Sequence, residues 1–174
     1  GTSAGAIVGA LYAAGHAWED ILDFFKTTQL FKVSNYASRK PGFVDPEKFY
    51  DRFLDYFPKD DFDSLTKPFY ITATNILDGT LSVFHSGQLI RPVLASASFP
   101  GVFAPVKINE GYYVDGGVLN NFPSDLIQKQ CDRLVGVYVN PFEKVAVDTL
   151  KHSFSVLERV FKIMMAKNCN KGSI

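Results

Sequence analysis

The first third of the chain carries apolar residues at helical spacing. The run from Ser3 to Gly15 consists mainly of small residues, and Gly15 provides a helix stop, so a helix that other backbone can approach closely is predicted. Residues 18–27 place apolar and acidic side chains on opposite sides of a second helix. At Asp45-Pro46, an N-cap residue followed by proline at the first helical position predicts a third.

From residue 69 onwards the spacing changes from helical to extended. Residues 69–76 and 81–84 are strand-like, and Asp78-Gly79 between them is a strong hairpin signal. The pattern further predicts a helix at 89–98, a hairpin of strands 106–108 and 112–114, and helices at 123–131 and 150–167.

A nearly unbroken apolar run, Leu134 to Val139, is typical of a central strand that is covered on both faces. Helices alternate with strands, and no internal repeat interrupts them. This order favours an α/β sandwich in which one sheet lies between helices.

Composition excludes several classes of function. The 18 basic and 18 acidic residues cancel, and no basic run is interleaved with aromatics, so we expect no nucleic-acid partner. Cys131 and Cys169 are far apart, which argues against a disulfide scaffold, and no histidine pair has metal-ligand spacing, so we expect neither metal nor cofactor. No apolar run approaches the roughly 20 residues of a membrane-spanning helix, although peripheral membrane contact stays open. The oligomeric state is also left open.

Gly1-Thr2-Ser3-Ala4-Gly5 fits the pattern Gly-x-Ser-x-Gly directly before a small-residue helix. Such a turn lifts a serine hydroxyl out of the backbone, and we expect its two glycines to avoid Cβ collisions. The Ala4 N–H, at the positive end of the helix, is the natural donor to an oxyanion. The alternative is a serine that merely caps a tightly packed helix.

Asp115-Gly116-Gly117 places a carboxylate at the end of a strand, before two glycines that let the backbone turn and approach closely. This arrangement suits a base held beside a nucleophile. An ordinary Asp-Gly turn is the structural alternative.

These two motifs, together with the stretch from Ala95 to Val106, resemble the patatin-like phospholipase family in content and order. The resemblance implies hydrolysis of acyl esters of lipids by a Ser-Asp dyad, with Ser3 as nucleophile and Asp115 as base. It also implies an α/β three-layer sandwich with a central, mostly parallel sheet flanked by helices.

The family carries a glycine-rich oxyanion loop before the nucleophile. Because the sequence opens at Gly1, we expect residues 1–174 to form a single patatin-like domain whose first strand and glycine-rich loop lie upstream. Any targeting signal would lie upstream as well, so the compartment is left open, with the cytoplasm favoured.

Two other functions stay open. Ser3, Asp115 and His152 occur in the chain order of an α/β-hydrolase triad, but His152 lies within a helical pattern, which favours a surface position. A catalytically silent lipid-binding fragment would share the fold. Five aromatic and apolar residues either line an acyl channel or form an ordinary core; they are Phe24, Phe25, Leu30, Phe31 and Phe43. The basic pair of Arg39 and Lys40 either meets a phosphate headgroup or is simply solvated.

Overall fold

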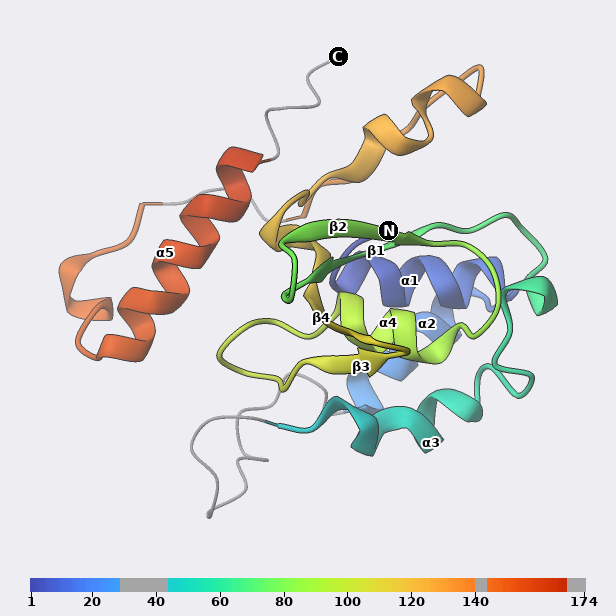
Figure 1. Ribbon diagram of the computed structural model, residues 1–174, viewed down its shortest axis with the longest axis horizontal. Coiled ribbons are helices and arrows are strands. Elements are labelled where there is room, and N and C mark those ends of the chain that lie inside the picture. The colour runs from blue at the N-terminus through green and yellow to red at the C-terminus, as the bar shows by residue number, and fades with distance from the viewer. Residues whose placement is uncertain (29–43, 140–143, 169–174) are drawn as a thin grey trace.

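The computed structural model describes residues 1–28, 44–139 and 144–168. Within these ranges the fold is α/β, with a four-stranded sheet and helices packed on it (Figure 1). The helices are α1 (Ala4–Ala13), α2 (Trp18–Thr27), α3 (Tyr50–Leu54), α4 (Ile90–Ser96) and α5 (Ser153–Asn168). The strands are β1 (Ile71–Asn75), β2 (Thr80–Phe84), β3 (Val106–Ile108) and β4 (Gly111–Asp115). Short 3₁₀ helices are η2 (Pro46–Phe49), η3 (Phe62–Ser64), η4 (Gly116–Val118), η5 (Pro123–Leu126), η6 (Gln128–Gln130) and η7 (Val147–Thr149).

The sheet has the strand order β2-β1-β4-β3, and each neighbouring pair is antiparallel. Two predicted hairpins build it: β1 turns into β2 at Asp78-Gly79, and β3 turns into β4 at Asn109, which adopts a φ of 51°. Strand β4 then lies beside β1 with Asp115 opposite Ala73. The hairpin predictions are confirmed, whereas the expected mostly parallel sheet is not found among the described strands.

One stretch of backbone does pair with β1 in the parallel sense. The Gly1 nitrogen donates to the Tyr70 carbonyl, and the Thr72 N–H donates to the Gly1 carbonyl over 3.1 Å. This alternation is the hydrogen-bond pattern of parallel strands. On the same edge of β1, Ile76 N–H donates to Tyr112 in β4. Residue 1 and β4 therefore lie end to end along one edge of β1.

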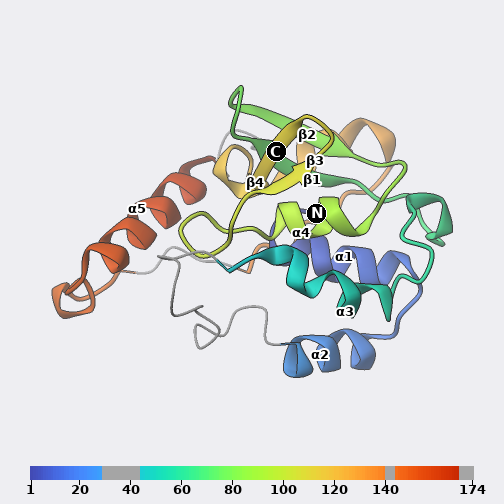
Figure 2. The ribbon, with the colours of Figure 1, turned by 60° about the horizontal axis from the view of Figure 1, so that its bottom comes forward.

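The hydrophobic core lies between one face of the sheet and the helices α1 to α4. Figure 2 shows α4 and α1 directly beneath the sheet, with α3 and α2 further from it. The buried face of α1 combines small residues with Ile7 and Leu11, and Gly9 is closely approached by the ring of Phe69, a side chain where backbone was predicted. Fully buried members of this core include Ile7, Leu11, Phe24, Phe53, Ile71, Ile90 and Val93.

The opposite face of the sheet is covered differently from the predicted layer of helices. Thr72 and Thr74 of β1 are buried there, and η4 packs against this strand. Helix α5 stands beside the sheet in both views (Figures 1 and 2). The expected three-layer sandwich is therefore not seen in the described part of the chain.

The prediction of a central strand from Leu134 to Val139 is wrong for this structure. Val135, Val137 and Val139 are 86%, 77% and 73% exposed, and the segment pairs with none of the described strands. Apolar content indicates a strand only where a neighbouring strand accepts its backbone hydrogen bonds. The predicted helix at 123–131 is also replaced, by the two shorter helices η5 and η6.

Candidate active site

Ser3 sits in a strained turn between the paired backbone of Gly1 and the start of α1. Its φ of 54° and ψ of −136° are unusual for a residue with a side chain. Conformations of this kind cost on the order of 1–3 kcal/mol and persist where surrounding contacts hold them. Here Ser3 N–H donates to Ser96 Oγ over 3.0 Å, and the Ser3 carbonyl accepts from Ala6 N–H over 2.9 Å. This is the geometry that exposes a nucleophilic serine.

The two glycines that flank Ser3 behave differently. A Cβ on Gly1 would lie 2.5 Å from the Gly5 carbonyl oxygen, so only glycine fits this approach to the first turn of α1. A Cβ on Gly5 would meet no heavy atom within 4 Å. The expectation of steric necessity is confirmed for Gly1 and wrong for Gly5 in this structure, because Gly5 faces outward from α1.

Asp115 is the last residue of β4 and is fully buried. Its backbone N–H donates to the Ser98 carbonyl over 3.0 Å, and its carbonyl accepts from Thr74 Oγ1 over 3.0 Å. The side-chain oxygen Oδ1 accepts from Gly117 N–H over 2.8 Å. These three bonds fix both the backbone and the orientation of the carboxyl group.

The glycines after Asp115 allow close packing. A Cβ on Gly116 would collide with the Thr72 carbonyl and lie 2.7 Å from the hydroxyl oxygen of Thr2. A Cβ on Gly117 would collide with the Met165 methyl group. The turn thus fits closely against the backbone turn that carries Ser3, as the Asp-Gly-Gly pattern predicts, and also against α5, which the pattern did not predict.

Sheet geometry explains why Ser3 and Asp115 come near each other. Both β4 and the backbone of Gly1 occupy the same edge of β1, and they run toward each other along it. Asp115 ends opposite Ala73, two residues along β1 from Ile71, beside which Gly1 is paired. The chain following Gly1 therefore reaches Ser3 beside the end of β4.

The environment tunes the acidity of this carboxyl group. Burial raises the pKa of Asp115 from 3.8 to about 6, while the Ser3 hydroxyl and the Gly117 N–H both lower it. The other oxygen, Oδ2, is buried without a hydrogen-bond partner. The Ser3 hydroxyl therefore lies near enough to lower the pKa of the carboxyl group without completing a hydrogen bond to Oδ2. Catalytic contacts are often this loose before substrate binds. The result is a carboxylate that can accept a proton near neutral pH.

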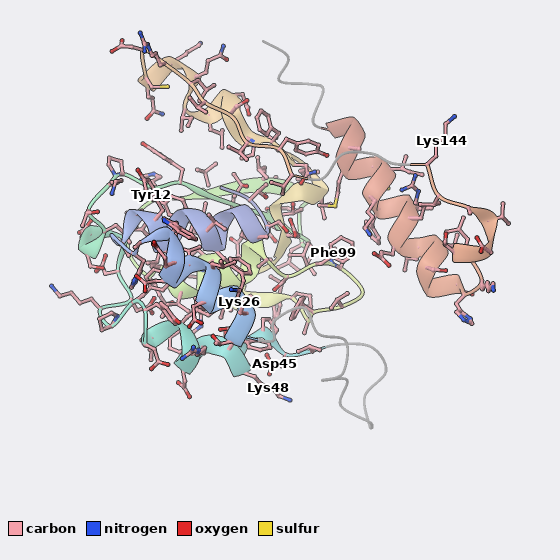
Figure 3. All side chains as sticks on the ribbon, turned by 180° about the vertical axis from the view of Figure 1, so that it is seen from behind. Tyr12, Lys26, Asp45, Lys48, Phe99 and Lys144 are labelled. Atoms are coloured by element: carbon pink, nitrogen blue, oxygen red, sulfur yellow. The ribbon has the colours of Figure 1, made fainter. Side chains whose placement is uncertain are left out.

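Helix α5 forms a wall beside this turn. Met165 is 8% exposed and contacts Gly117, and the ring of Phe161 packs edge-on against Phe99 with centroids 6.1 Å apart. Figure 3 shows Phe99 on the side of the main body that faces α5. The apolar surface next to Asp115 is consistent with an acyl substrate.

The histidines take other positions. His152 is exposed and precedes α5, where its carbonyl accepts from the Ser155 hydroxyl. Met165 lies thirteen positions further along the chain, which corresponds to roughly 20 Å along the helix axis. Asp115 and His152 are thus not assembled into a triad. A ring nitrogen of His16 bonds the Tyr56 carbonyl over 3.1 Å, and the ring of His85 lies tilted against that of Tyr70 with centroids 5.5 Å apart.

The structure describes some of the remaining aromatic, basic and cysteine residues singled out in the sequence, and others lie outside the described ranges. Phe24 is fully buried in the core and Phe25 packs against it, which confirms the ordinary interpretation of both. Leu30, Phe31, Arg39, Lys40 and Phe43 lie outside the described residues. Cys131 is free and exposed, and Cys169 is likewise outside these ranges.

The described residues offer neither a metal site nor a membrane-spanning helix. The described side chains contain no group of three or more histidine, cysteine, aspartate or glutamate residues placed to hold a metal ion. Among the described helices, none has the length and apolar character needed to cross a membrane.

Sequence reasoning missed Ser96, Ser98 and Met165 as neighbours of the site. Ser96 and Ser98 lie within the stretch that carries the family resemblance, so a search for buried hydroxyls near the two motifs offers a signal for them. Met165 belongs to an amphipathic helix whose pattern does not reveal its partner.

The site places Ser3, in a strained turn before α1, near the buried carboxyl group of Asp115. Comparison with known proteins identifies the class of protein to which this arrangement belongs. Residues 1–126 match the model of the patatin-like phospholipase family. This match covers well over half of the chain, which therefore belongs to the patatin-like phospholipase family.

Similar proteins come from bacteria, a virus and a yeast. An uncharacterised NTE family protein of Mycobacterium tuberculosis is 29% identical over 146 residues, 82% of this chain and 41% of that protein. A probable lipid hydrolase of Invertebrate iridescent virus 6 is 33% identical over 76 residues, 41% of this chain and 26% of the viral protein. Lysophospholipase NTE1 of Meyerozyma guilliermondii is 25% identical over 146 residues, 80% of this chain and 10% of the yeast protein. The chain thus spans less than half the length of each of these relatives.

Proposed function

We propose that this protein hydrolyses acyl esters of lipids, with Ser3 as nucleophile and Asp115 as general base. The observation that carries the proposal is the buried carboxyl of Asp115. One of its oxygens is fixed by Gly117 N–H, and the other has no hydrogen-bond partner. The Ser3 hydroxyl lies close enough to lower the pKa of this carboxyl. Family membership and the lipid hydrolases among the relatives support the same reaction class.

In the first half of the reaction, the Ser3 hydroxyl proton passes to Asp115 Oδ2 while Ser3 Oγ attacks the ester carbonyl carbon. The carbonyl oxygen becomes an oxyanion, and Ala4 N–H at the start of α1 is a candidate donor to it because the first N–H groups of a helix have no partner within the helix. The bond to the alcohol then breaks, and protonated Asp115 returns the proton to the departing alkoxide. The product is an acyl-enzyme on Ser3.

In the second half, Asp115 accepts a proton from water, and the resulting hydroxide attacks the acyl carbon. Collapse of the new tetrahedral intermediate breaks the bond to Ser3 Oγ, which recovers the proton from Asp115. A fatty acid is released and both residues return to their starting states. A pKa of about 6 suits this cycle, because the carboxylate is ionised at neutral pH yet basic enough to take up a proton.

The proposed substrates are phospholipids, lysophospholipids or simple acyl esters at the surface of a membrane or micelle. The apolar wall of Phe99, Phe161 and Met165 next to the base supports an acyl chain on this side. We include residues 127–174 in the same domain as the family match, because α5 packs on the turn that follows the base.

The test is ester turnover by the complete protein and three variants. Ser3→Ala and Asp115→Asn are expected to lose at least about 100-fold in kcat/KM, because general base and nucleophile act together. His152→Ala is the control, since this exposed residue lies at the far end of α5. Full activity in Asp115→Asn, or loss in a folded His152→Ala, would overturn the dyad. An inactive wild type that still binds lipid would favour a silent lipid-binding protein.

A further inference from the structure

The C-terminal end of α4 contacts both halves of the proposed dyad. Ser96 Oγ accepts the Ser3 N–H over 3.0 Å, and the backbone carbonyl of Ser98 accepts the Asp115 N–H over 3.0 Å. Both serines are fully buried, although they are more than 90 residues from Ser3 and more than 15 from Asp115 in the chain. Ser98 lies two residues beyond α4, and its side-chain hydroxyl donates back to the Leu94 carbonyl in the helix. Ser96 is thus the side chain of α4 that reaches the nucleophile turn.

The contact of Ser96 meets a specific need of that turn. With φ at 54°, the Ser3 N–H points away from α1 and toward α4. The carbonyl of Ser3 is held by Ala6, so Ser96 supplies the second anchor of the same residue. Without an acceptor, this partly buried N–H loses its hydrogen bond, and the strained conformation loses one of the contacts that hold it.

The helix that carries Ser96 is hydrogen-bonded at its start and buried along its length. Asp60 accepts N–H bonds from Leu89 and Ile90 at the start of α4, over 3.2 Å and 2.6 Å. Most of α4 is buried between the sheet and α1, including Val93 and Ala95. A hydroxyl on a buried, capped helix holds its partner more precisely than one on a loop.

We propose that Ser96 is a positioning residue for the nucleophile: its hydroxyl oxygen holds the Ser3 backbone in the strained turn and so aims Ser3 Oγ toward Asp115 and the substrate. This inference rests on the proposed function. It predicts that Ser96 affects the rate of each active site, since the residue contacts Ser3 and not the substrate.

The experiment measures kcat and KM per active site in the complete protein, with active sites counted by fluorophosphonate labelling and the labelled residue mapped by mass spectrometry. Ser96→Ala removes the acceptor. Val93→Ala is the matched control, because Val93 is equally buried on the same helix and contacts neither dyad residue by a hydrogen bond. A residue that merely supports the fold lowers the number of active sites and leaves the rate of each one unchanged.

We expect Ser96→Ala to reduce kcat per site by about tenfold, equivalent to about 1.4 kcal/mol, with KM within about twofold. Val93→Ala should keep kcat per site within about twofold despite a lower melting temperature. An unchanged kcat per site in Ser96→Ala, or an equal fall in Val93→Ala, would overturn the inference.

A second variant covers the case in which Ser96→Ala does not fold. Ser96→Cys keeps a side chain of similar size but offers only a weak acceptor, so the same slowing is expected. If both Ser96 variants fail to fold while Val93→Ala folds, Ser96 serves the fold and the inference is wrong. The proposed function is judged separately: a wild type that takes no label at Ser3 refutes it and this inference together, whereas a labelled wild type with normal Ser96 variants refutes the inference alone.

Discussion

At the scale of single residues, the site is governed by competition between burial and hydrogen bonding at Asp115. Burial favours the neutral carboxylic acid, whereas the Gly117 N–H and the Ser3 hydroxyl favour the carboxylate. Burial has the larger effect, so the pKa of the group rises to about 6. A base of this strength is obtained at a cost in stability, because the folded protein must bury a charge above this pH.

Stability should therefore depend on pH through Asp115. Below pH 3.8 the carboxyl is protonated in both the folded and unfolded states. Between that pH and about 6 the unfolded chain releases the proton while the folded chain keeps it, so this group's contribution to the free energy of unfolding falls as pH rises. The loss is on the order of 3 kcal/mol, since each pKa unit corresponds to about 1.4 kcal/mol. Asp115→Asn should match wild type at pH 4 and exceed it at pH 8 in urea unfolding. A stability difference that does not change with pH would contradict this assignment.

The glycines give a second prediction at this scale. Gly116→Ala places a methyl group against the Thr72 carbonyl, a backbone atom that cannot rotate away, so it should destabilise the protein by about 2 kcal/mol or more. Gly5→Ala adds its methyl group to open space within α1 and should stabilise by about 0.5–1 kcal/mol. Melting temperatures of the two variants should move in opposite directions, and a loss of stability in Gly5→Ala would show that the space beside α1 is filled.

At the scale of elements, α4 connects the nucleophile and base turns to the rest of the core. Its start is fixed by Asp60, which also accepts bonds from Tyr50 and Gln88. Its end supplies the oxygen atoms that hold Ser3 and Asp115. The hydrogen bonding at the start of this helix therefore depends on one carboxylate, while packing in the core holds the rest of it.

Asp60→Ala should lower the free energy of unfolding by about 2–3 kcal/mol, because it removes the side-chain acceptor of two backbone N–H groups at the start of α4 and two side-chain bonds. Of the two N–H groups, that of Leu89 keeps the Asp60 carbonyl as an acceptor over 3.3 Å, whereas that of Ile90 loses its bond to Asp60. Asp78→Ala is the control. This aspartate also accepts a backbone N–H, from Thr80, but lies in an exposed hairpin turn, where water replaces the lost bonds. Chemical denaturation should show a loss for Asp78→Ala of about 1 kcal/mol or less, and equal losses would contradict the role given to Asp60.

Local signals in the sequence predicted most of these elements. Helix α2 begins and ends where its pattern indicates, and Asp78-Gly79 forms its turn because glycine there adopts a φ of 69°. Tertiary pairing decided the remainder. The apolar run from Leu134 to Val139 has the composition of a strand but no described neighbour to pair with, and sequence alone does not state which strand lies beside it.

At the scale of the whole molecule, the site depends on contacts between distant parts of the chain. Ser3, Ser96 and Asp115 meet because Gly1 and β4 share one edge of β1 and α4 crosses beneath it. The motifs named Ser3 and Asp115 as candidates, since their residue types carry the chemistry. Ser96 could not be placed in this way, because its role arises only from the packing of α4 against the nucleophile turn.

The docking of α5 is testable at this scale. Met165→Ala removes the side chain that packs on Gly117 and should weaken the attachment of the helix. Amide hydrogen exchange within α5 should accelerate by about tenfold, because less energy is needed to detach it. Lys162→Ala removes an exposed ion pair with Glu158 and should leave exchange nearly unchanged. Equal protection in both variants would show that Met165 does not anchor α5.

The most direct test of the account is the pH dependence of fluorophosphonate labelling at Ser3 in the complete protein. If Asp115 is the base, the labelling rate should rise with pH through about 6 and then level off, because the carboxylate must be ionised to take the serine proton. Asp115→Asn should lose this rise and label at least about 100-fold more slowly, whereas His152→Ala should follow the wild-type profile. A wild-type profile retained by Asp115→Asn, or label mapped to a residue other than Ser3, would contradict the dyad.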